Sequence, residues 1–309
     1  MLHRSHDRKA AGPSVKYCCV IRTPVIEILI AAGLIVTTAV LVSASMHDLR
    51  SREVPDIHWA IICIAGLVLL TAAAFDGGVT IQRMMILAGA CLVVADILYD
   101  KERSPVVDTV FYAAVAVSFA VPIITTLEDT FVQNTLAIPI CYMLFVILFY
   151  AGVLVGGADV KCLISLAIIF PMYPAAYGIP VIDIPAADMI PSIVSFPLTV
   201  LLYASVISML LMIPMAVRNI RRGDTEFPNM LLGYRIDAGE AEELYVWPMA
   251  EKKKKGVSPE DTDGAGKAST SAPESSDGKI WVTPKIPFIL PITAAVVITA
   301  VIGNVIFLL

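Results

Sequence analysis

The sequence predicts an all-α polytopic membrane protein, with about eight transmembrane helices and a small cytoplasmic domain between the last two. Of its 309 residues, 58% are hydrophobic and only 16% are charged, and the mean hydropathy is +0.81. A soluble fold of this size could not bury so much apolar surface. The net charge of -5 excludes the basic surface typical of nucleic-acid binding. We therefore expect membrane lipids and membrane proteins as partners, and no nucleic acid.

Apolar stretches recur along the chain at about the ~20 residues that a helix needs to cross a bilayer. They lie near 25–45, 57–75, 81–99, 106–126, 136–155, 160–177, 193–217 and 286–309. We expect the sixth stretch to be short or broken, because Pro171 and Pro174 interrupt it and proline removes a helical hydrogen bond.

Loop charge predicts the orientation, because Lys and Arg near helix ends favour the cytoplasm. The basic residues of alternate loops fall on one side of the membrane, which we assign to the cytoplasm; they are Arg50, Arg52, Lys101, Arg103, Lys161, Arg218, Arg221 and Arg222. The segment before the first helix is also basic and disagrees with this orientation. The later loops agree among themselves, and the prediction follows them.

Composition divides the chain into five parts. We expect an N-terminal extension over 1–24, a membrane core over 25–217 and a small cytoplasmic domain over 218–250, followed by a linker over 251–279 and a C-terminal transmembrane helix over 280–309. The small domain mixes aromatic, aliphatic and acidic residues, so an α+β fold with short strands is open to it. The linker has too few large apolar residues to offset the entropy of ordering, which predicts disorder.

Two acidic residues lie at the cytoplasmic ends of apolar helices, where an ionised side chain is costly unless it is partnered or functional. Asp48 closes the first span, and Asp56, just ahead of the next span, is expected to cap that helix. Asp159 follows three small residues, Gly156, Gly157 and Ala158, which allow a backbone or a substrate to approach closely. Taken singly, Asp159 is equally well explained as a helix cap, and Asp48 as an interfacial charge.

The two positions together favour a catalytic interpretation. An even number of crossings separates Asp48 from Asp159, so both are expected at the same membrane face and depth. Two adjacent carboxylates share one proton and titrate as a unit. The ionised member can activate water against a peptide carbonyl, while the protonated member polarises the carbonyl oxygen. This chemistry needs neither a cofactor nor a metal, and the sequence has no C-x-x-C pair or clustered histidines to hold one.

Two segments also carry a resemblance to a known family. Asp48–Asp56 (DLRSREVPD) and Gly156–Lys161 (GGADVK) resemble the two signature regions of type IV prepilin peptidases, the Gly-x-Gly-Asp membrane aspartyl proteases. The C-terminal stretches Phe227–Arg235, Trp247–Pro248 and Trp281–Phe288 resemble the archaeal branch of that family, which includes the preflagellin peptidases. The likeness covers most of residues 25–309.

The resemblance implies an aspartic endopeptidase of the plasma membrane, whose active site faces the cytoplasm. Its partners would be prepilin or archaellin precursors, from which it removes a basic leader. The resemblance makes Asp48 and Asp159 the catalytic residues. The supporting residues would be Gly156, Gly157, Ala158, Lys161 and Pro55. Two features depart from the family pattern: Ala158 stands where the motif usually has its second glycine, and the spacing of about 110 positions between the two Asp is longer by about one helix pair.

Two other functions remain open from the residues alone. Four other acidic residues also lie in or near spans, as in proton- or cation-coupled transporters: Glu27, Asp96, Asp100 and Asp108. A transporter would show an inverted repeat with broken helices, which the sequence does not display. A non-enzymatic scaffold would use 218–285 to dock a partner and both Asp as helix caps. The natural substrate, whether pilin, archaellin or another filament subunit, and the oligomeric state are not predicted.

Overall fold

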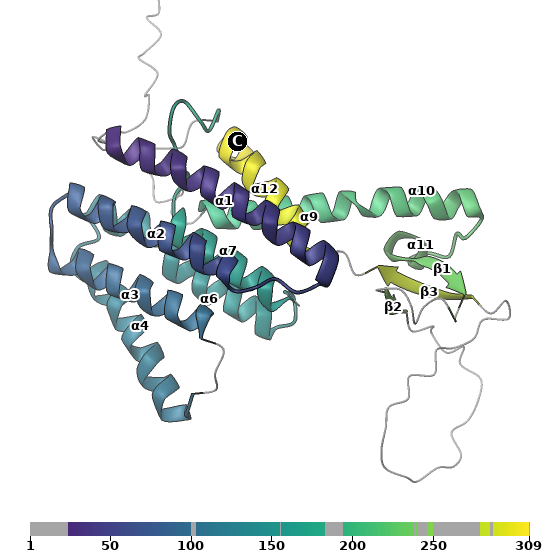
Figure 1. Cartoon of the computed structure of the whole chain (residues 1–309), viewed down its shortest axis with the longest axis horizontal. Helices are drawn as coiled ribbons and strands as arrows, with labels where there is room; N and C mark the ends of the chain where they lie inside the picture. Colours follow the sequence, from purple (N-terminus) through teal and green to yellow (C-terminus); the bar gives the residue numbers. More distant parts are fainter. Residues whose placement is uncertain are drawn as a thin grey trace, which may run out of the picture. The chain divides into compact units, whose positions relative to one another are not determined.

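A computed structural model describes residues 24–99, 103–154, 156–182, 194–237, 239, 246–249, 279–284 and 287–308. The predicted extension and the predicted linker, apart from Pro24 and Lys279, lie outside the described residues. The chain divides into two compact units, Met1–Ser205 with Phe288–Leu309 and Val206–Pro287 (Figure 1). Each unit is described by itself below.

The first unit is helical. Its described helices are α1 (Pro24–Ser51), α2 (Ile57–Asp76), α3 (Ile81–Leu98), α4 (Pro105–Thr125), α5 (Thr130–Thr135), α6 (Ala137–Tyr150), α7 (Gly157–Ile169), the start of α9 (Phe196–Leu210), α12 (Ile289–Ile302) and the 3-10 helix η2 (Val305–Leu308). In the part of the chain that the structure describes, six helical stretches are long and apolar enough to cross a membrane: α1, α2, α3, α4, α5 with α6, and α9 with α10 (Met212–Arg222). This confirms the predicted all-α polytopic membrane protein.

All eight predicted spans are helical at their expected places, but two are too short to be counted among the six. The helix α7 has 13 residues and α12 has 14. Proline explains the first, since α7 ends at Ile169, just before Pro171. Glycine explains the end of the second, since α12 stops at Ile302 and its C-cap Gly303 has a φ of 93°, which is strained for other residues.

The short helix α7 is the core of the unit. Its residues from Cys162 to Ile169 are all buried, and it packs against α2, α6, α3 and α12 (Figure 1). A helix that is apolar on every side belongs in such a position. Gly66 of α2 permits the closest approach, because a Cβ there would lie 2.8 Å from the N and Cα atoms of Ile169. Asp159 therefore lies at the start of a helix whose remaining turns are tightly packed against its neighbours.

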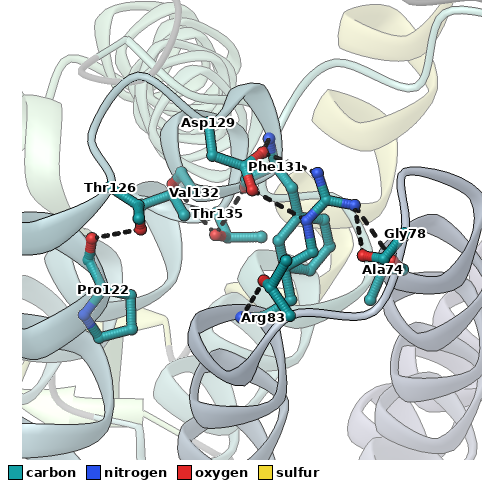
Figure 2. Close-up of polar contacts among 10 residues, drawn as sticks. Ala74, Gly78, Arg83, Pro122, Thr126, Asp129, Phe131, Val132 and Thr135 are labelled. Carbon is teal, nitrogen blue, oxygen red and sulfur yellow. Dashed lines mark hydrogen bonds and ion pairs between the residues drawn. The ribbon is translucent and has the colours of Figure 1, made fainter.

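At the end of the bundle opposite Asp159, Arg83 at the start of α3 connects the end of α2 with the turn before α5. Figure 2 shows its guanidinium between the end of α2 and the turn before α5. Its Nε and Nη2 atoms donate to the two carboxylate oxygens of Asp129, both at 2.9 Å, and Nη1 donates to the carbonyls of Ala74 and Gly78. Asp129 also accepts from the backbone N–H of Phe131 at 2.9 Å. The hydrogen bond from Arg83 is the main cause that lowers the pKa of Asp129 below its usual value.

Arg83→Met is expected to lower the free energy of unfolding by about 3 kcal/mol, because it leaves the largely buried Asp129 charge without its partner. Thermal unfolding in detergent would show this as a Tm lower by several degrees. The double variant Arg83→Met with Asp129→Leu should recover part of the loss, since it removes the unpaired charge. A Tm for the single variant within 1 °C of the wild type would contradict this role.

The second unit combines helices with a small sheet. It contains α10, α11 (Asn229–Leu232) and three strands, β1 (Tyr234–Asp237), β2 (Val246–Pro248) and β3 (Lys279–Pro284). The strand order is β1-β3-β2, with both pairings antiparallel (Figure 1). The central strand follows the predicted linker, whereas its two neighbours precede it. The sheet is therefore built from both sides of that stretch.

Trp281, a residue of the C-terminal stretches singled out in the sequence, lies in the interior of this unit. Trp281 is buried and donates from Nε1 to Glu226 Oε2 at 2.8 Å. The guanidinium of Arg235 lies 5.5 Å from the ring centre of Trp281 and pairs with Asp224 and Glu226. These contacts give Trp281 and Arg235 a structural role.

Candidate active site

Asp48 lies in the last turn of α1, half-buried. The helix ends shortly after it because Arg52 adopts a φ of 60°, a left-handed conformation that a regular helix cannot contain. The chain then turns through Pro55 into α2. The carbonyl of Pro55 accepts from the backbone N–H of His58 at 3.2 Å and contacts Nδ1 of the same residue at 3.0 Å. The turn that follows Asp48 is thus fixed at both of its ends.

Asp159 lies in the first turn of α7, where a carboxylate is favoured by the exposed N–H groups of the helix. Gly156 is the N-cap, and the Asp159 carboxylate lies directly against it. A Cβ on Gly156 would be 2.3 Å from Oδ2 of Asp159 and 2.9 Å from its Cγ. Gly156 therefore leaves the space that the carboxylate occupies.

The two carboxylates are close enough to affect each other. The pKa of Asp159 is raised to about 7, first by burial and second by the negative charge of Asp48. This shift favours the protonated form of Asp159. A half-buried acid that keeps a proton beside a second carboxylate is suited to general acid-base hydrolysis.

The supporting residues predicted from the sequence differ in their surroundings. Within the described residues, a Cβ on Gly157 would meet no atom within 4 Å, and Gly157 is exposed, so there is open space beside it. Ala158 is half-buried beside it. Lys161 is directed to Asp56, with 2.9 Å between Nζ and Oδ1.

Two residues near the start of α2, Asp56 and His58, make contacts that the sequence does not predict. Asp56 was expected to cap α2, but its side chain makes no capping hydrogen bond and pairs with Lys161 instead. His58 is buried, and its Nε2 lies 3.1 Å from Oγ of Ser43 in α1. Asp56 and Lys161 are 105 positions apart, and Ser43 and His58 are 15 apart. No local sequence pattern therefore indicates either contact. A buried histidine one turn into an apolar helix was the available hint.

Within the ranges that the structure describes, no three His, Cys, Asp or Glu side chains gather as potential metal ligands. The expectation of a site without metal or cofactor stays a prediction.

A cavity of about 180 Å³ lies elsewhere, at the other end of the bundle, where Arg83 and Phe131 form part of its wall. It reaches Ile26 and Ile30 near the start of α1, on the order of 30 Å along the helix from Asp48 at 1.5 Å per residue. The cavity and the two carboxylates are therefore separate features.

Three proteins named preflagellin peptidase are similar to this chain over most of their length. The one from Methanocaldococcus jannaschii is 26% identical over 280 residues, which cover 85% of this chain and 91% of that protein. The one from Methanococcus maripaludis is 28% identical over 202 residues, which cover 63% and 84%. The one from Methanococcus voltae is 22% identical over 269 residues, which cover 85% and 92%. No protein-family model matches the chain.

Proposed function

This chain belongs to the archaeal preflagellin peptidase family, and we propose that it is an aspartic endopeptidase that removes the basic leader of archaellin or type IV pilin-like precursors. The names of its relatives support a peptidase that acts on a preflagellin. The aspartic mechanism rests on one observation: the charge of Asp48 contributes to the raised pKa of Asp159. The two carboxylates that the signature segments supply are thus electrostatically coupled.

In the proposed mechanism, Asp48 is the ionised member and Asp159 carries the shared proton. Asp48 takes a proton from a water molecule, whose oxygen attacks the scissile carbonyl carbon. Asp159 donates a hydrogen bond to the carbonyl oxygen and stabilises the negative charge that develops there. The proton on Asp48 then passes to the leaving amine as the C–N bond breaks. The exposed Gly157 and the open space around it would admit an extended peptide.

The proposed orientation places this chemistry at the cytoplasmic face. Arg50 and Arg52 follow Asp48 directly, and Lys161 follows Asp159 by two residues. Basic residues next to spans favour the cytoplasm. A leader that precedes the substrate's own transmembrane helix would reach Asp48 and Asp159 at the cytoplasmic face of the membrane.

The proposal is tested with purified chain in lipid vesicles, incubated with an archaellin precursor that carries its leader. We expect one cut between the basic leader and the apolar helix, located by mass spectrometry of both products. A precursor whose leader bases are changed to Gln serves as the control and should be cleaved more slowly. No cleavage of archaellin or pilin-like precursors by folded protein would overturn the proposal.

The transporter alternative finds less support in the contacts of the other intramembrane acids. Asp96 pairs with Arg103 and accepts a hydrogen bond from the hydroxyl of Tyr142. Asp108 lies 3.8 Å from the same arginine. These contacts join α3, α4 and α6, which gives both acids a structural role. Vesicles that contain the chain should accordingly show no proton flux above that of empty vesicles.

A further inference from the structure

One ion pair joins the two signature segments directly. Asp56 lies in the turn after Asp48, directly before the first residue of α2. Lys161 lies in α7, two residues after Asp159. Their charged atoms are 2.9 Å apart, and their side chains are 40% and 20% exposed. A pair this exposed contributes little to the free energy of unfolding in general. Stabilising the fold is therefore a minor role for this ion pair.

The other side of the same α2 turn is attached to α1. His58 lies two residues beyond Asp56 and contacts Ser43 Oγ through Nε2 and the Pro55 carbonyl through Nδ1. Its ring also meets that of His47, the residue before Asp48, with 5.3 Å between ring centres. Thus the first turn of α2 contacts the helix of Asp48 on one side and the helix of Asp159 on the other.

We propose that Asp56 and Lys161 are positioning residues, whose ion pair sets the distance between the catalytic carboxylates by fixing α7 to a turn that His58 anchors on α1. The inference rests on the proposed function of Asp48 and Asp159. Neither Asp56 nor Lys161 takes part in bond making. Because general acid-base catalysis depends steeply on the placement of its groups, a displacement of about 1 Å can cost about 100-fold in rate.

A direct electrostatic role of Lys161 on Asp159 makes a different prediction from a positioning role. If the ammonium charge acted on Asp159 alone, Asp56→Asn would leave the lysine in place and leave the rate unchanged. If the pair acts as a unit, removal of either member has the same effect. Removal of both members then costs no more than removal of one.

The test is a double-mutant cycle in vesicles, with Asp56→Asn, Lys161→Met and the double variant, assayed for leader removal. We expect each single variant to lower kcat by roughly 10- to 100-fold with KM changed less than about threefold, and the double variant to match the singles. Lys161→Arg preserves the pair and should retain at least about a third of the wild-type kcat. The Tm of every variant should stay within about 2 °C of the wild type, as expected for an exposed pair.

Glu53→Gln is the matched control, because it removes one negative charge from the same turn, at an exposed position, and leaves the Asp56–Lys161 pair intact. Its kcat should stay near that of the wild type. Independent, multiplicative losses in the double variant, or an inactive Lys161→Met beside a fully active Asp56→Asn, would overturn the positioning role. A wild type that does not cleave would instead refute the proposed function, which separates the two failures.

Discussion

Asp48→Asn and Asp159→Asn are each expected to lower kcat/KM for leader removal by about 10³-fold or more. Asparagine has nearly the shape of aspartate but can neither take a proton from water nor donate the shared proton. General acid-base groups contribute typically ~10²–10⁴ each, and the loss of either member disables a pair that acts together. The measurement is the initial rate of leader release in vesicles at matched protein levels, with folding checked by Tm.

The double variant Asp48→Asn with Asp159→Asn should be no slower than the slower single variant, since residues that act as a unit are not additive. Glu27→Gln provides the control, because Glu27 lies in the first turn of the same helix α1, at the end remote from Asp48. That variant should cleave at the wild-type rate. Substantial cleavage by either Asn variant would refute the paired mechanism.

Gly156→Ala is expected to lower kcat by about 100-fold, the loss that a displacement of about 1 Å can cause, while leaving the fold intact. The added methyl would lie 2.3 Å from Oδ2 of Asp159, so the carboxylate must move. The side chain can rotate to do so, and the backbone φ of -89° at Gly156 is ordinary for alanine. The expected signature is therefore a large loss of rate with a Tm near that of the wild type.

Gly157→Ala is the neighbouring comparison. A Cβ there meets no atom of the described residues within 4 Å, so the Asp159 carboxylate keeps its place, and we expect the larger share of activity to remain. Equal rates for Gly156→Ala and the wild type would show that the observed position of the carboxylate is not the catalytic one.

The helices could be predicted from the sequence because apolar runs and prolines are local signals. The early end of α7 followed from Pro171 in this way. The burial of α7 on all sides could not be predicted in the same way, since it depends on α2, α6, α3 and α12 packing around it. The place of Gly66 against Ile169 likewise appears only when two distant helices meet.

The candidate site shows the same division. Asp48 and Asp159 were identified from motif and helix parity, and they remain proposed catalytic residues. The partner of Asp56 was misjudged because a cap is a local explanation, whereas Lys161 lies 105 positions away. The contact between Arg83 and Asp129 spans 46 positions and escaped notice for the same reason. Charged residues that connect helices carry no periodic signal along the chain.

The pH dependence of kcat/KM for leader removal tests most directly whether Asp48 and Asp159 share one proton. The pKa of Asp159 is about 7, so the proton of the pair is lost as the pH rises through that value. We predict a bell-shaped profile that falls about tenfold per pH unit above about pH 7 and falls again in acid, where Asp48 also becomes protonated. A profile that stays flat from pH 6 to pH 9 would contradict the shared-proton account.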